Sequence, residues 1–72
     1  MNDVRVAVIG VGHLGRIHAR LLKGVAGAKL VAVADLSAAN RQQAATETGA
    51  EACEDFRQLI GRIDAAIVAL PF

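Results

Sequence analysis

Aromatic residues and cysteine are scarce in this sequence of 72 residues, which contains no Trp, no Tyr, two Phe and one Cys. With so few aromatic rings, the core must consist of Val, Ile, Leu and Ala, a composition that suits parallel strands buried under helices. The single cysteine, Cys53, excludes an internal disulfide and a cysteine-rich metal cluster. We interpret it as a small, buried apolar residue in a reducing compartment.

Long apolar runs and charge runs of one sign are also lacking. The apolar stretches are far shorter than the ~20 residues that span a bilayer, and the run over residues 4–11 leads into a glycine-rich turn without a signal-peptide cleavage pattern. Eight basic and seven acidic residues are scattered along the chain and give a formal net charge of +1. These features predict a cytoplasmic protein without a nucleic-acid-binding or membrane-binding surface.

Short apolar runs alternate with helical patterns. Runs rich in Val, Ile and Ala predict strands over residues 4–9, 29–34 and 65–70, the last of them ended by Pro71, and residues 51–53 are a further strand candidate. Between the first two strands, an amphipathic helix that Gly24 or Gly27 would end is predicted by the spacing of its apolar residues. These are Leu14, Ile17, Leu21, Leu22 and Val25.

Two further helices are predicted from their caps. Ser37 is expected to cap a helix that ends at Gly49. Its apolar face consists of Ala38, Ala44 and Ala45. Asp55, with Gln58 three residues later, resembles a capping box at the start of a short third helix.

The resulting order is β-α-β-α-β-α-β, which predicts an α/β fold with a parallel sheet and right-handed crossovers. In a Rossmann-type doubly wound sheet the strand order would be 3-2-1-4, and ligands bind where the winding reverses. The fourth strand would then be a bare apolar edge. We therefore expect residues 1–72 to be the first part of a dinucleotide-binding domain, with strands five and six and a C-terminal substrate domain absent.

The pattern Gly-Val-Gly-His-Leu-Gly at residues 10–15 is the strongest functional signal. A Gly-x-Gly-x-x-Gly pattern alone is weak, but this one directly follows a predicted strand and opens a predicted helix. An acidic residue, Asp35, ends the next strand 20 positions after Gly15. This context predicts a pyrophosphate-binding turn, with a glycine turn that merely joins strand to helix as the alternative.

Each residue of the turn has a physical task. Gly10 permits the tight turn, Gly12 lets a pyrophosphate approach the backbone, and Gly15 lets the helix pack closely on the sheet. The backbone amides of His13 and Leu14 are expected to point at the phosphates from the positive end of the helix dipole.

Asp35 is the predicted ribose-binding residue. Its carboxylate can accept hydrogen bonds from both ribose hydroxyls and would repel a 2′-phosphate, which favours NAD over NADP. Arg41 leaves NADP open, because it can swing toward a 2′-phosphate or stack near adenine, or it can be a solvated helix residue. The alternative for Asp35 is a carboxylate that leads into the helix capped by Ser37.

The two histidines do not suit a metal site. His13 and His18 are five residues apart, which fits neither the i, i+3 nor the i, i+4 pairing of a helical site. We interpret His18 as a packing or hydrogen-bonding residue without a catalytic role.

The sequence resembles the Gfo/Idh/MocA oxidoreductases. The resemblance lies in Val-Ala-Val-Ile-Gly-Val-Gly-His-Leu-Gly-Arg-Ile-His-Ala-Arg, in Val-Ala-Val-Ala-Asp ending at Asp35 with Arg41 following, and in Asp-Ala-Ala-Ile-Val-Ala-Leu-Pro ending at Pro71. It implies that residues around the proline, Leu70 and Pro71, line the dinucleotide. It covers essentially the whole chain.

The resemblance also implies reversible hydride transfer between a nicotinamide and a hydroxyl-bearing carbon of a sugar, cyclitol or related compound. In the family, a Glu-Lys-Pro motif and a C-terminal domain supply catalysis and the substrate pocket, and neither is present. Lys23 and Lys29 lie in the wrong context to replace that lysine, so no catalytic residue is assigned. The chain alone is expected to be inactive and to bind dinucleotide weakly, and the full-length protein is compatible with a homo-oligomer.

Two other functions share parts of this pattern. An S-adenosylmethionine-dependent methyltransferase also uses a glycine turn and an acidic residue after its second strand, but its turn typically reads Gly-x-Gly-x-Gly, whereas residue 14 is Leu. A non-catalytic regulatory nucleotide-binding module can share every residue discussed above.

Overall fold

The computed structural model describes residues 3–69. Its strands are β1 (Val4–Ile9), β2 (Ala28–Ala34), β3 (Glu51–Cys53) and β4 (Ala65–Val68). Its helices are α1 (His13–Leu22), α2 (Ala38–Thr48) and the 3-10 helix η1 (Phe56–Leu59). The predicted bounds of β1 and β3 are confirmed residue for residue, and β2 begins one residue earlier than predicted. The strand predicted over residues 65–70 ends at Val68, so the prediction is wrong at residue 69, while residue 70 lies outside the described residues.

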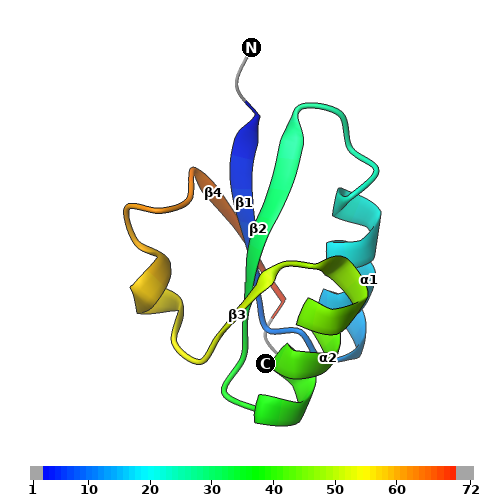
Figure 1. Cartoon of the computed structure of the whole chain (residues 1–72), viewed down its shortest axis with the longest axis vertical. Coiled ribbons are helices and arrows are strands. Elements are labelled where there is room, and N and C mark those ends of the chain that lie inside the picture. The colour runs from blue at the N-terminus through cyan, green and yellow to red at the C-terminus, as the bar shows by residue number, and fades with distance from the viewer. Residues whose placement is uncertain (1–2, 70–72) are drawn as a thin grey trace.

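The four strands form one parallel sheet in the order β3-β2-β1-β4. Helices α1 and α2 cover one face of this sheet, and η1 lies on the opposite side (Figure 1). The predicted Rossmann-type doubly wound order, with its reversal between β1 and β4, is confirmed. No helix within residues 3–69 is both long and apolar enough to cross a membrane.

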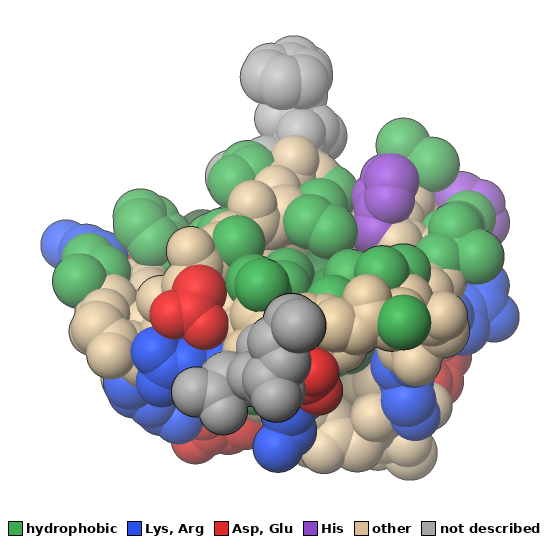
Figure 2. Space-filling model, turned by 90° about the horizontal axis from the view of Figure 1, so that it is seen from above, with side chains coloured by type: hydrophobic (Ala, Val, Ile, Leu, Met, Phe, Trp, Pro, Cys, Tyr) green, Lys and Arg blue, Asp and Glu red, His purple; other side chains and the backbone are tan. Residues whose placement is uncertain are grey.

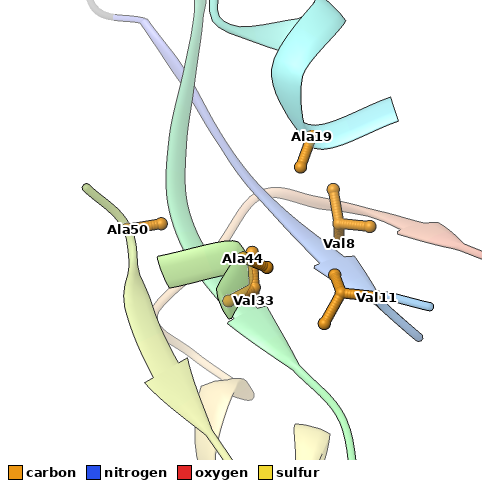
Figure 3. Close-up of a cluster of buried hydrophobic side chains, with 6 residues drawn as sticks. All are labelled: Val8, Val11, Ala19, Val33, Ala44 and Ala50. Carbon is orange, nitrogen blue, oxygen red and sulfur yellow. The ribbon is translucent and has the colours of Figure 1, made fainter. Parts of the chain in front are cut away.

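The hydrophobic core occupies both faces of the sheet. Under α1 and α2 it consists of small and β-branched side chains, drawn in Figure 3: Val8, Val11, Ala19, Val33, Ala44 and Ala50. On the other face, Leu59 of η1 packs with Cys53 and three alanines of β1 and β2. Cys53 is the buried apolar residue that we predicted, and burial raises the pKa of its thiol.

The apolar face predicted for α1 is only partly correct. Leu14 and Leu21 are 65% and 67% exposed, whereas the buried residues of α1 are Gly15 and Ala19. The helix approaches the sheet through these small residues, so the leucines are left on its flanks. In Figure 2, hydrophobic side chains accordingly gather at the surface beside the histidines, both of which belong to α1.

The caps of α2 are confirmed. The Ser37 hydroxyl accepts a hydrogen bond from the Asn40 N–H at 3.2 Å, and Gly49 ends the helix with φ of +79°. The predicted alanine face is correct at Ala44, which is fully buried, and wrong at Ala38, which is exposed. Ala38 lies in the first turn of α2, which extends past the carboxyl end of β2 (Figure 1).

The third helical segment is a single 3-10 turn. Asp55 caps it as predicted, but the Asp55 Oδ1 accepts from the Arg57 N–H at 2.9 Å, while the Gln58 N–H donates to the Asp55 carbonyl at 3.0 Å. The bonding is thus a tight local turn in place of the predicted capping box. So short a helix presents only one buried side chain, Leu59, to the sheet.

The turn between β1 and α1 brings two glycines into close contact. Gly10 has φ of +88°, a conformation that L-residues with side chains rarely adopt. A Cβ on Gly15 would lie 1.7 Å from the Gly10 carbonyl oxygen. Gly15 therefore has a packing role, and its partner is the backbone of the turn itself.

We expect Gly15→Ala to lower the free energy of unfolding by about 1–3 kcal/mol, because only a shift of α1 can relieve the overlap with the Gly10 carbonyl. Urea unfolding followed by circular dichroism measures the change. Gly12→Ala is the matched control, since a Cβ there would meet no heavy atom within 4 Å. Equal destabilisation by both variants would mean that the contact with Gly10 is not the cause.

Arg5 and Asp64 join the amino ends of β1 and β4. The Arg5 Nη2 donates to the Asp64 Oδ1 at 3.0 Å and the Arg5 Nε donates to Oδ2 at 3.1 Å. The Arg5 backbone N–H donates to the same Oδ2 at 2.8 Å. These hydrogen bonds to the ionised carboxylate lower the pKa of Asp64 to about 2.

The Arg5–Asp64 pair predicts acid sensitivity of the fold. Because the pKa of Asp64 is lower in the folded chain than the ~3.9 of an unfolded Asp, the pair stabilises the fold fully above about pH 4 and loses this effect as the pH falls toward about 2. We therefore expect the melting temperature to fall more steeply between these pH values in the wild type than in Asp64→Asn. Thermal unfolding across this range measures it, and parallel curves for the two chains would contradict the prediction.

Candidate functional site

A cleft of about 670 Å³ opens where the carboxyl ends of β1, β2 and β4 meet. One wall comes from the glycine turn and α1, and consists of Gly10, Gly12, His13, Leu14 and His18. The segment after β2 contributes Asp35, Leu36 and Asn40, and the end of β4 contributes Val68 and Ala69. The cleft therefore lies at the point where the winding of the sheet reverses, the place at which such sheets bind ligands.

The glycine turn presents the amino end of α1 to this cleft. The helix begins at His13, directly after Gly12. The N–H groups of His13 and Leu14 belong to the first turn, where the helix itself offers no carbonyl acceptor. A Cβ on Gly12 would meet no heavy atom within 4 Å, so the backbone is open to an approaching group. Free amides at the positive end of a helix dipole form an anion-binding arrangement.

Asp35 follows β2 directly and links two backbone segments through its half-buried carboxylate. The Oδ2 atom accepts from the Val11 N–H of the glycine turn at 2.9 Å, and Oδ1 accepts from the Ser37 N–H at 2.8 Å. A carboxylate offers about four acceptor positions. Within the described residues, two of these positions accept backbone N–H groups, and Asp35 also lines the cleft.

The bond from Val11 was not foreseen. The Val11 side chain is fully buried in the core, while its amide reaches the carboxylate at the end of the neighbouring strand. The only sequence signal for it is that Asp35 ends the strand next to the one that leads into the turn. Asp35 therefore both shapes the site and lines it.

Arg41 lies in α2 and turns back toward the segment after β2. Its Nη1 donates to the carbonyl oxygens of Asp35 and Leu36, both at 3.2 Å, and its Nη2 lies 3.9 Å from the Glu54 Oε2. The side chain is only 19% exposed, so the interpretation of Arg41 as a solvated helix residue is wrong. Arg41 is not among the described residues that line the cleft.

Several residues of the cleft were missed by sequence reasoning. Leu36 and Asn40 follow Asp35 closely, and their positions beside a predicted ribose-binding carboxylate were the only signal for them. His18, interpreted as a packing or hydrogen-bonding residue, is exposed and lines the cleft, so the packing role is wrong and the hydrogen-bonding role stays a prediction. The cause is the orientation of α1, which turns its small residues toward the sheet.

The β4 side of the cleft is described only as far as residue 69. Val68 pairs with Ile9 at the end of β1, which places Val68 and Ala69 next to the glycine turn. The predicted dinucleotide contacts Leu70 and Pro71 lie outside the described residues.

A smaller cleft of about 390 Å³ adjoins the larger one at Asp35 and Leu36. It extends from the ends of β1 and β2 to the segment over residues 54–57, where Phe56 is half exposed. Asp35 therefore separates two hollows along the carboxyl edge of the sheet.

Comparison with known proteins identifies relatives over nearly the whole chain. Residues 4–72 match the Gfo/Idh/MocA oxidoreductase family, NAD-binding Rossmann fold. The chain is 42% identical over 71 residues to the inositol 2-dehydrogenase of Rubrobacter xylanophilus, which covers 94% of this chain and 20% of that protein. It is 42% identical over 74 residues to the scyllo-inositol 2-dehydrogenase (NAD(+)) of Bacillus subtilis, which covers 97% of this chain and 22% of that protein.

A solved structure has the same fold. The scyllo-inositol dehydrogenase of Lactobacillus casei with bound NAD(H) and scyllo-inositol superposes with a TM-score of 0.87 at 31% identity, over 97% of this chain and 22% of that one. The chain thus spans about a fifth of the length of the relatives it matches. Sequence and fold agree, and the chain belongs to the Gfo/Idh/MocA oxidoreductase family, in which it matches the NAD-binding Rossmann fold.

Proposed function

We propose that this chain binds NAD in the larger cleft and forms the first part of the dinucleotide-binding domain of a dehydrogenase that acts on a cyclitol, sugar or related polyol. The observation that carries this proposal is the meeting of the first amides of α1 with the Asp35 carboxylate in one cleft at the reversal point of the sheet. The names of the inositol dehydrogenases that the chain resembles support the substrate class.

The glycine turn fits a pyrophosphate. The amides of His13 and Leu14 would donate to the phosphate oxygens, and the missing side chain of Gly12 leaves room for them. Gly10 and Gly15 act by holding the turn against α1 through their close contact. The chain therefore supplies neutral donors and a dipole, and needs no basic side chain at this point.

Asp35 fits an adenosine ribose without a 2′-phosphate. Its two remaining acceptor positions match the 2′- and 3′-hydroxyls in number. A 2′-phosphate would remove one donor and place a negative charge against the carboxylate, so NAD is favoured over NADP. Leu70 and Pro71, which follow β4 in the sequence, stay predicted contacts of the dinucleotide.

The chemistry of the reaction comes from the nicotinamide, which accepts or donates a hydride when NAD is bound. The described residues bind and orient the dinucleotide, and we assign them no proton transfer. Lys23 follows the end of α1 and Lys29 lies near the start of β2, so both lie at the amino ends of the strands, opposite the cleft. Catalytic residues and the substrate pocket are therefore expected in the remaining length that the relatives have.

Two other functions were compatible with the glycine pattern. The relatives named above are dehydrogenases, which favours a nicotinamide cofactor over S-adenosylmethionine. A regulatory nucleotide-binding module would use the same cleft and would differ only in having no turnover in the full-length protein. Comparing the binding of NAD and S-adenosylmethionine tests the methyltransferase alternative. Turnover by the full-length protein tests the regulatory module.

We expect NAD to shift the backbone amide signals of Gly12, His13 and Leu14 in ¹H–¹⁵N spectra of this chain, because these groups face the phosphates. Gly12→Ala should weaken the binding of NAD at least about tenfold, since the methyl group of the alanine would occupy the space of the phosphates. S-adenosylmethionine at the same concentration is the matched comparison. Tighter binding of S-adenosylmethionine than of NAD would contradict the proposed function.

We expect Asp35→Ala to weaken the binding of NAD more than the binding of NADP. NAD loses the acceptors for its two ribose hydroxyls, whereas for NADP the loss is offset because a repulsive charge is removed. The measured quantity is the ratio of the two dissociation constants, which we expect to change about tenfold or more. A general effect on the loop would weaken both dinucleotides alike. An unchanged ratio would show that the carboxylate does not distinguish the two riboses.

A further inference from the structure

We infer that Arg41 is a positioning residue, which holds the Asp35 loop (residues 35–37) in the shape that binds an unphosphorylated ribose, and that it is not a receptor for a 2′-phosphate. This inference rests on the proposed NAD binding, because it assigns the selectivity of the same site. It changes the interpretation of a basic side chain that contacts the backbone of the predicted ribose-binding residue.

The Asp35 loop reverses direction within a few residues, and Arg41 holds that bend. Successive carbonyls of an extended chain point to opposite sides. Here two successive carbonyls, those of Asp35 and Leu36, both accept from the same Nη1 of Arg41. The guanidinium therefore holds these carbonyls on one side, and the chain bends at Leu36.

This bend sets the position of the Asp35 carboxylate. Once the chain has turned at Leu36, the Ser37 N–H reaches the Asp35 Oδ1 at 2.8 Å, and the other oxygen reaches the Val11 N–H at 2.9 Å. The Arg41 backbone N–H also donates to the Ser37 carbonyl at 3.1 Å, which ties the loop to the start of α2. Arg41 thus acts on the ribose position through the backbone that carries Asp35.

A 2′-phosphate receptor needs free donors on the cleft side. The Arg41 side chain is 19% exposed and is not among the residues that line the larger cleft; its Nη1 donates to two carbonyls, and its Nη2 lies 3.9 Å from the Glu54 Oε2. Rotation toward a phosphate would break both hydrogen bonds and leave Glu54 without this cation. Asp35 and Glu54 would then both repel the phosphate, so the arrangement opposes NADP.

The planar guanidinium is required for this role. A lysine at position 41 would keep the positive charge near Glu54, but a flexible point charge does not reproduce the guanidinium's fixed geometry. Arg41→Lys therefore separates charge from geometry, and Arg41→Met removes both. Arg20→Met is the control, because Arg20 is an exposed residue of α1 that lines neither cleft.

The first measurement needs no ligand. We expect Arg41→Met and Arg41→Lys to speed hydrogen exchange of the Val11 and Ser37 amides about threefold to tenfold, because the loop loses the two long hydrogen bonds, each 3.2 Å, that the Arg41 guanidinium donates to its carbonyls. Exchange of the Val33 amide in the core of β2 serves as the internal reference for global unfolding. Unchanged exchange at Val11 and Ser37 relative to Val33 would overturn the positioning role.

The second measurement is dinucleotide binding by nuclear magnetic resonance titration. We expect Arg41→Met to weaken the binding of NAD about threefold to tenfold without weakening the binding of NADP. In the Asp35→Ala background, Arg41→Met should have no further effect on NAD binding. A larger loss of affinity for NADP than for NAD would identify Arg41 as a phosphate receptor and overturn the inference. If the wild-type chain binds no NAD, the proposed function fails, while the exchange measurement still decides whether Arg41 positions the loop.

Discussion

The hydrogen bond between the Asp35 carboxylate and the Val11 amide is the interaction on which the rest of the site depends. It joins the ends of β1 and β2 across 24 residues of sequence, after the pairing of the two strands has ended. Just beyond the last backbone bond between them, which the Gly10 N–H donates to the Ala34 carbonyl at 2.8 Å, it joins the glycine turn to the Asp35 loop. The amino end of α1 and the carboxylate are thereby held in the same cleft.

Much of the fold followed from the sequence because buried parallel strands form short, uninterrupted apolar runs. Residues 6–9 and 30–34 illustrate this, since each run is entirely apolar and stops at a residue that changes the backbone direction or the polarity, Gly10 and Asp35. The strand order followed from the alternation of strands with helices, which permits few parallel topologies. The glycine spacing placed the cleft, because its residues had to follow the first strand and open the first helix.

The side-chain environments were harder to predict, for physical reasons that particular residues show. Periodicity identifies an apolar stripe on a helix, but the distance of the helix from the sheet decides which part of the stripe is buried. In α1 that distance is set by the contact of Gly15 with the Gly10 carbonyl, so Leu14 and Leu21 stay exposed. Arg41 was ambiguous for a similar reason, since its partners are carbonyls that become available only when the Asp35 loop bends.

The dual use of Asp35 explains why a carboxylate suits this position even before a ribose is considered. An asparagine has one acceptor oxygen, and its amide nitrogen would meet either the Val11 or the Ser37 N–H, a donor against a donor. Because Val11 is buried, its unpaired amide would cost roughly 1–3 kcal/mol. Under the proposed function, the carboxylate that would oppose a 2′-phosphate is therefore also the group that supplies the two acceptors joining the two loops. Selectivity for an unphosphorylated ribose and stability of the cleft would then have the same physical origin.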